Sequence, residues 1–132
     1  MSFVLLMIED PAQRGTRTEA EGRHVYEEMV AWSGTLAARG LLQDSQSLQG
    51  HAGATRVKVR DGRAQVMDGP FAEAKEMVGG LFVVDVATRE EAVALARECP
   101  AARYLTVEVR GLGPCFMDGM EVGSETQGRV GT

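Results

Sequence analysis

Two short apolar runs, Ser2–Ile8 and Leu81–Val86, most constrain what this chain can fold into. Each is continuous rather than alternating, which is typical of a β-strand buried on both faces. Only two segments, about 19–39 and 89–98, have the length and spacing of sustained helices, and two helices cover only one face of a sheet. Because monomers avoid a large exposed apolar patch, the sequence predicts a homodimer that packs through its sheet faces.

The segment from about residue 19 to residue 39 carries one apolar stripe at helical spacing. The stripe consists of Val25, Met29, Trp32 and Leu36. Two alternative capping boxes, 16–19 and 18–21, precede it, and Gly40 suits the position just after its last turn. The sequence therefore predicts a long first helix that packs on the sheet through this stripe.

A β-hairpin is predicted in the middle of the chain. Thr55–Val59 alternates between a threonine and valine face and a basic face, Asp61-Gly62 is a strong turn signal, and Arg63–Met67 supplies the return strand. Leu41–Gln49 suits a short strand or an extended link. Ala72–Met77, after the hairpin, suits one or two helical turns.

The second helix is predicted at about Arg89–Glu98, after a capping box that Thr88 starts and Glu91 completes. Pro100 stops it, and Tyr104–Val109 forms the last strand. Strands and helices therefore follow one another in the order β-α-β-β-β-α-β, with a turn after the hairpin. This order predicts an α+β fold.

The 132 residues suit one domain, and they include 14 basic and 19 acidic residues, a net charge of −5. An acidic chain argues against nucleic-acid and anionic-membrane partners, so the basic face of the hairpin is interpreted as solvated. No apolar run approaches the ~20 residues of a membrane span. Two cysteines without an export signal favour a cytoplasmic protein. The glycine-rich segment 111–132 is expected to be a poorly ordered tail behind a domain of residues 1–110.

The block Asp68–Glu76, with the sequence DGPFAEAKE, is the most specific motif of the chain, and Gly79-Gly80 follows it. Together with Glu108–Arg110 at the end of the last strand, this block resembles the DGPF-type branch of the YCII-related family. The resemblance covers about residues 1–110. It implies a ferredoxin-like α+β fold that dimerises through its sheets, as in dimeric α/β-barrel proteins.

The resemblance implies less about function. Genes of the family often lie beside those of extracytoplasmic-function sigma factors, and some relatives are enzymes that act on small aromatic compounds. Related proteins commonly have a threonine where this chain has Ala74, which argues against an essential hydroxyl there. The wider family often places a histidine in the middle of the first helix, where this chain has Met29. His24 lies ~140° around the helix from that position, so the role does not transfer to it.

Asp68, Lys75 and Glu76 are the candidate catalytic residues. One helical turn near the end of a strand would gather their carboxylates and ammonium, and like charges and burial tune ionisation for acid–base work. The alternatives are an Asx-turn for Asp68 and a solvated surface ion pair for the other two. His24, at the edge of the apolar stripe, is a further candidate acid–base group, with an ordinary surface histidine as the alternative.

A ligand pocket is predicted between the first helix and the sheet, with Met29, Trp32, Phe71 and Phe82 as its walls; for Phe71 the alternative is core packing. No metal site is predicted, because the histidines and cysteines lack ligand spacing, and no cofactor, because a phosphate-binding glycine loop is absent. Two functions follow. One is binding of a small aromatic or carbonyl molecule, with cofactor-free acid–base lyase or isomerase activity. The other is a non-catalytic regulatory or ligand-sensing dimer in a sigma-factor pathway.

Overall fold

The computed structural model describes residues 1–117 of the chain. Its elements are, in chain order, β1 (Ser2–Glu9), α1 (Pro11–Gly15), α2 (Glu19–Ala38), β2 (Leu42–Ser47), η1 (His51–Gly53), β3 (Thr55–Arg60), β4 (Arg63–Asp68), β5 (Met77–Asp85), α3 (Arg89–Glu98), η2 (Pro100–Arg103) and β6 (Thr106–Gly111). The two η elements are single 3-10 turns. None of the described helices is long and apolar enough to cross a membrane.

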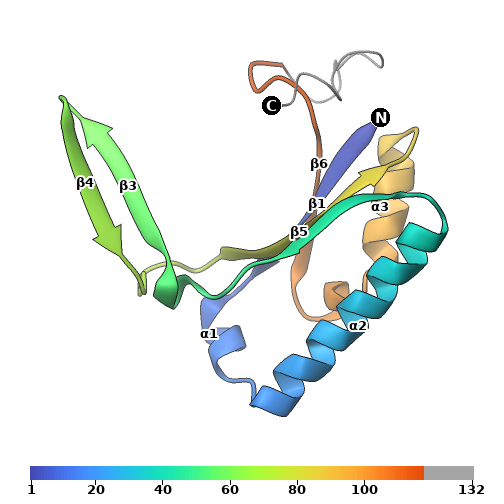
Figure 1. Cartoon of the computed structure of the whole chain (residues 1–132), viewed down its shortest axis with the longest axis horizontal. Coiled ribbons are helices and arrows are strands. Elements are labelled where there is room, and N and C mark those ends of the chain that lie inside the picture. Colours follow the sequence, from blue (N-terminus) through green and yellow to red (C-terminus); the bar gives the residue numbers. More distant parts are fainter. Residues whose placement is uncertain (118–132) are drawn as a thin grey trace.

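The four strands β2, β5, β1 and β6 form one antiparallel sheet in that order. Helices α2 and α3 lie together on one face of this sheet (Figure 1). Each helix connects two strands of the sheet, α2 between β1 and β2 and α3 between β5 and β6, and the first strands of the two units are central neighbours. This order is that of a ferredoxin-like α+β fold, so the predicted fold class is confirmed.

We call the four-stranded sheet and the two helices the body of the molecule. The core fills the space between the sheet and the helices. Phe3, Leu5 and Met7 of β1 are buried at alternate positions, as the two-residue period of a strand requires. Trp32 and Leu36 are the buried residues of α2. They belong to the predicted apolar stripe, so the stripe correctly identified the packed face of the helix.

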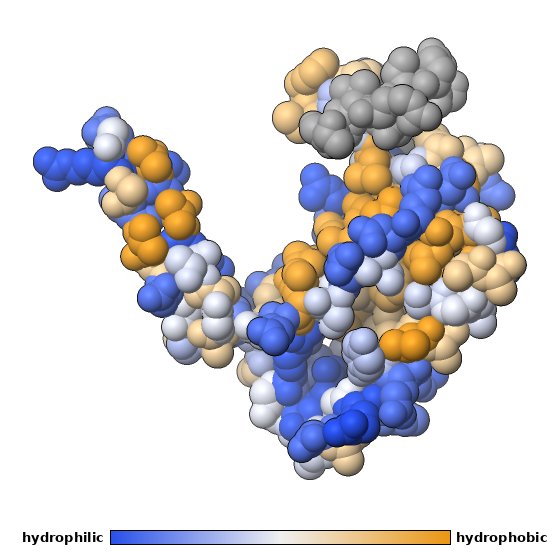
Figure 2. All heavy atoms as spheres, viewed as in Figure 1, coloured by the Kyte–Doolittle hydropathy of each residue, from blue (hydrophilic) through white to orange (hydrophobic). Residues whose placement is uncertain are grey.

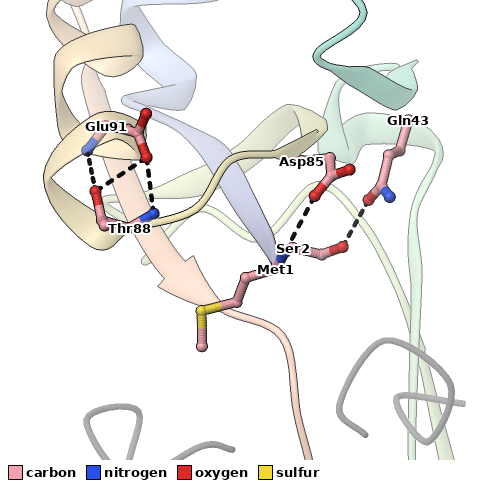
Figure 3. A network of polar contacts seen from close by, with 6 residues as sticks. All are labelled: Met1, Ser2, Gln43, Asp85, Thr88 and Glu91. Carbon is pink, nitrogen blue, oxygen red and sulfur yellow. Dashed lines mark hydrogen bonds and ion pairs between the residues drawn. The ribbon is translucent and has the colours of Figure 1, made fainter. Parts of the chain in front are cut away.

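Both long helices begin at capping boxes. The Thr18 hydroxyl accepts the Glu21 backbone N–H at 3.1 Å, and the Glu21 carboxylate accepts the Thr18 N–H at 2.9 Å, so the second of the two alternative boxes forms. Thr88 and Glu91 make the same reciprocal pair at the start of α3 (Figure 3). After α2, Gly40 adopts a φ of +73°, a left-handed conformation that glycine enters at little cost.

Polar contacts fix the start of β1 between its neighbours. The Met1 ammonium lies 3.1 Å from the Asp85 carboxylate at the end of β5, and the Ser2 hydroxyl donates to the Gln43 side chain on β2 at 2.7 Å (Figure 3). These contacts sit at the sheet end near the start of α3.

The strands β3 and β4 form a separate two-stranded ribbon that projects away from the body (Figure 1). They pair around Asp61-Gly62, whose positive φ angles of 53° and 73° are those of the tight turn that this dipeptide favours. Every residue of both strands is exposed. The predicted hairpin is therefore present, and we call residues 55–68 the arm.

The face of the sheet that turns away from the helices is apolar in its two central strands. Its side chains there are half-buried: Val4, Leu6, Ile8, Leu81 and Val83. Within one chain, the central strands are thus fully covered on the helix side alone. The sequence predicted burial on both faces, and the described residues of this single chain leave the second face half-buried; that it is covered by a second copy stays a prediction.

Two local predictions were wrong. Ala72–Met77 contains no helical turn, because the chain returns from the arm here and Met77 already pairs with Glu9 in the sheet. Asp10-Pro11 and Gly15 are residues typical of turns and predict a turn after β1, but this segment forms the short helix α1. Asp10 caps it by accepting the Ala12 N–H at 2.9 Å, and Pro11 occupies its first position, where a missing N–H costs nothing.

The predicted boundary at residue 110 and the tail behind it stay a prediction. Gly111 is the last residue of β6, and the Leu112 N–H still donates to the Ser2 carbonyl at 3.1 Å. Phe116, in the glycine-rich segment, is exposed. Residues 118–132 lie outside the described part of the chain.

Candidate ligand-binding site

A cavity of about 750 Å³ opens between α2 and the end of the sheet where β1 leads into α1. Side chains of β1, α1, α2, β2 and β5 line it, together with the segments that follow α1 and β2. Its volume falls within the ~300–1,000 Å³ of pockets that hold small molecules. It lies where the sequence predicted a pocket, between the first long helix and the sheet.

The inner wall of the pocket is apolar. Met7 of β1, Met29 of α2 and Phe82 of β5 line it, and Trp32 stands behind Phe82, with the two ring centroids 5.0 Å apart in an edge-to-face arrangement. The Cys99 sulfur lies 3.9 Å from the sulfurs of both methionines. Because Cys99 is buried, its thiol has a pKa raised above the usual value, and it acts as a packing group rather than as a thiolate.

A partly buried ion pair lies at one end of the pocket. The Arg14 guanidinium donates from Nε and Nη2 to the two carboxylate oxygens of Glu9, at 3.0 and 2.7 Å. Arg14 also donates to the Leu48 carbonyl at 2.9 Å. The side chain of Glu9 is only 5% exposed and that of Arg14 29%. Such a bidentate ion pair fixes both side chains and offsets the cost of burying the charges.

Gly79 makes room for this pair, and Gly80 makes room for the neighbouring strand β2. At Gly79 a β-carbon would collide with the Glu9 carboxylate, and at Gly80 it would lie 2.9 Å from the Gln46 carbonyl on β2. The pairing of β1 with β5 shifts register at this point, which places the extra residue of a β-bulge beside the ion pair. The Gly79-Gly80 dipeptide is therefore explained by close packing at the end of the pocket.

Arg17 is the second cation on the pocket wall. Its guanidinium lies over the ring of Tyr104, 5.3 Å from the centroid, and no carboxylate of residues 1–117 forms an ion pair with it. Burial, and secondly the Glu28 carboxylate, raise the pKa of Tyr104. With Glu9 and Arg14 compensating each other, Arg17 gives the pocket a net positive charge.

The predicted wall residues separate into two groups. Met29 and Phe82 line the pocket, and Trp32 supports it from behind. Phe71 is buried elsewhere, at the base of the arm, where the Arg56 guanidinium lies 3.9 Å from its ring centroid. Phe71 thus follows the alternative of structural packing.

The predicted catalytic residues do not line this pocket. The Asp68 carboxylate is exposed at the base of the arm and accepts the Thr55 hydroxyl at 2.8 Å. Lys75 and Glu76 are exposed in the non-helical return segment. His24 is 73% exposed on α2, with its Nε2 3.9 Å from the Glu28 carboxylate. Within a single chain these four residues are not gathered around one ligand, and their assignment as catalytic stays a prediction.

Glu9 and Arg14 are the site residues that sequence reasoning missed. They lie five positions apart across a strand end and a proline, a spacing that matches no motif. The available signal is the glycine pair at 79–80, because Gly79 is far from Glu9 in sequence but lies against its carboxylate in space. Within residues 1–117, no three His, Cys, Asp or Glu side chains group as metal ligands would.

The fold and the pocket together define a small ferredoxin-like α+β protein with a cavity between its first long helix and its sheet. The model of the YCII-related domain matches residues 1–113. An uncharacterised protein of Rhizobium meliloti (strain 1021) is 30% identical over 114 residues, which cover 85% of this chain and 92% of that protein. The chain belongs to the YCII-related family.

Proposed function

We propose that this protein binds a small aromatic or carbonyl molecule in the pocket between α2 and the sheet. The observation that carries the proposal is a cavity of about 750 Å³ with an apolar inner wall and a fixed ion pair at one end. Most small-molecule sites combine these features, an apolar lining with few fixed polar groups. Met7, Met29 and Phe82 would contact the apolar part of the ligand.

The charge of the pocket favours a ligand with one acidic group. Glu9 is neutralised by Arg14, which leaves Arg17 as the cation available to a carboxylate or enolate. A planar guanidinium that already lies over an aromatic ring is well suited to hold such a group. Hydroxyls of Ser33 and Ser45 on the pocket wall would accept or donate further hydrogen bonds.

Binding, rather than catalysis, is the part of the proposal that the geometry supports best. Among the described residues, the one carboxylate on the pocket wall is that of Glu9. Both of its oxygens already accept hydrogen bonds from Arg14, so they are engaged in the ion pair rather than turned toward a ligand. This favours the ligand-sensing alternative over a lyase or isomerase. Acid–base chemistry would need Asp68, Lys75 or Glu76 to reach a ligand from outside this pocket.

The proposal includes a homodimer that forms through the sheet faces. Its support is the half-buried apolar face of β1 and β5, with Val4, Leu6 and Ile8 in a row.

Within the family, the block at 68–76 favours the DGPF-type branch. A role in a sigma-factor pathway rests on that resemblance alone.

A binding experiment tests the pocket. We expect benzoate to raise the melting temperature of the protein and the uncharged benzamide to raise it less, because ligands that bind the folded state stabilise it. Arg17→Gln should remove the difference between the two compounds. Arg23→Gln is the matched control, since Arg23 lies on the outer side of α2 in an exposed pair with Glu19. Native mass spectrometry of the purified protein shows whether a cellular ligand is carried along.

Two results would contradict the proposal. One is the absence of any co-purified small molecule together with no stabilisation by either compound. The other is equal loss of benzoate binding in Arg17→Gln and Arg23→Gln.

Sedimentation equilibrium tests the dimer. Leu6→Asp should be a monomer at concentrations where the natural chain is dimeric; a natural chain that stays monomeric at about 10 μM would disprove the sheet-face dimer.

A further inference from the structure

The arm is the one part of the described chain whose strands have no core beneath them. Every residue of β3 and β4 is exposed, and the valines Val57, Val59 and Val66 have 63, 57 and 63% of their surface in contact with solvent. Figure 2 shows hydrophobic residues along this projection, well away from the body. A two-stranded ribbon in water is marginally stable, so an exposed valine face of this kind is suited to docking.

The two faces of the arm differ in character. Strand register places Val57 opposite Val66 and Val59 opposite Ala64 on one face. The other face carries the basic side chains Arg56, Lys58, Arg60 and Arg63 beside Gln65 and Met67. The arm therefore offers an apolar strip backed by positive charge.

The base of the arm is fixed. The Gly69 N–H donates to the Ala54 carbonyl at 2.7 Å, and His51 Nδ1 accepts the Phe71 N–H at 3.1 Å. A β-carbon at Gly69 would collide with the His51 carbonyl. Buried Phe71 lies under Arg56, as described above. The block that begins at Asp68 thus anchors the arm, and an arm held at its base would lose less freedom on binding a partner.

The net charge of the arm indicates which partner it fits. The arm holds four basic and two acidic residues, a net charge of +2, whereas the rest of the chain holds ten basic and seventeen acidic residues, a net charge of −7. A second copy of this chain is therefore an electrostatic complement of the arm, and attraction of this kind guides association. Two-fold symmetry lets each copy supply one arm and receive one.

We infer that the arm docks through its valine face on a second copy of this chain, extending the sheet-face dimer. The arm leaves from β2 and returns into β5, two neighbouring strands of the sheet whose apolar face the dimer covers. This inference rests on the proposed dimer and adds a separate contact to it. The Asp68–Phe71 block then serves assembly, by holding the arm, rather than catalysis.

The test compares two double variants of the full chain on opposite faces of the arm. Val57→Ser/Val66→Ser removes the apolar pair, and Gln65→Ser/Met67→Ser shortens two uncharged side chains on the basic face. We expect the first to raise the dimer dissociation constant at least about tenfold, the effect of losing part of a buried apolar contact, and the second to change it less than about twofold. Raising the salt concentration should weaken the natural dimer, because salt screens the arm's charge.

Hydrogen–deuterium exchange gives a readout that does not depend on any variant. Amides of residues 55–68 should exchange more slowly in the natural dimer than in the diluted monomer. A dimer whose arm amides exchange equally fast in both states, and whose affinity is the same in both double variants, overturns the inference and leaves the sheet-face dimer standing. A chain that stays monomeric overturns both, and the ligand-binding proposal is unaffected.

Discussion

The strands of the body and those of the arm reach opposite degrees of burial. In β1, every second side chain from Phe3 to Met7 is buried against the helices. In β3, the corresponding alternate positions, Val57 and Val59, are exposed. Alternate side chains of any strand point to opposite faces, so the difference shows that burial depends on whether a second layer covers a face.

The two regions are also stabilised by different means. The body is held by a core that joins β1, β5, α2 and α3. The arm is held by its ladder of backbone hydrogen bonds, by the Asp61-Gly62 turn and by contacts at its base. A region without a core opens locally before the whole molecule unfolds, so substitutions in the two regions should have different consequences.

The largest expected effect is a deletion in the body's core. Leu36→Ala should lower the free energy of unfolding by about 3 kcal/mol, because Leu36 is fully buried and a cavity would remain. Val59→Ala in the arm should cost less than about 1 kcal/mol. Urea titrations followed by fluorescence of Trp32, the single tryptophan, measure both at protein concentrations low enough to keep the chain monomeric. Equal losses would contradict the distinction between the two regions.

Substitutions of charged residues should also cost more stability in the body than in the arm. Arg14→Ala leaves the Glu9 carboxylate buried without its partner, and we expect a loss of about 2–3 kcal/mol. This is less than for a fully buried pair, because Arg14 is itself partly exposed. In the arm, Arg63 lies directly opposite Arg60, and like charges across strands repel. Arg63→Ala should therefore leave stability unchanged or raise it slightly, and a marked loss there would show that the arm is part of the cooperative unit.

Gly40 and Gly62 allow the most closely matched comparison. Both have a φ of +73°, and at neither would a β-carbon meet another atom within 4 Å, so alanine imposes only the backbone cost of about 1 kcal/mol. At Gly40, at the end of α2, this cost should lower the stability of the whole molecule. At Gly62, it should speed amide exchange in residues 55–68 and leave the melting temperature of the body unchanged. A shared drop in melting temperature would show that arm and body unfold together.

The sequence predicted the elements whose signals are local. The stripe of α2, the Thr18 and Thr88 caps and the Asp61-Gly62 turn depend on residues a few positions apart, and each is present as expected. The helical turns expected at Ala72–Met77 are absent, because pairing of β5 with β1 overrides a weak local preference.

The site was harder to predict because it is formed by distant residues. Met29 and Phe82 were found through their apolar character, but the ion pair of Glu9 with Arg14 depends on a bulge at Gly79, which the sequence pattern does not reveal. Asp68 was singled out for its place in a specific motif. Its surroundings are those of a structural junction, the base of the arm, and its assignment as catalytic stays a prediction.

The smallest effect expected on stability distinguishes the two cysteines. Cys99 is buried in the body and Cys115 is exposed after β6. Since burial raises the pKa of Cys99, its thiol stays protonated in the folded state at a pH where the unfolded chain has begun to lose that proton. The unfolded state then binds fewer protons, so stability falls as the pH rises above about 9 and is unaffected by this group below it. Unfolding free energies between pH 8 and 10 should therefore decline more steeply for the natural chain than for Cys99→Ala.

The two cysteines should also differ in reactivity. In the folded protein a thiol reagent should modify exposed Cys115 at least about 100-fold faster than buried Cys99. Cys115→Ser is the control, because only Cys99 remains in it; rapid modification of that variant would mean that the core around Met7 and Met29 opens readily.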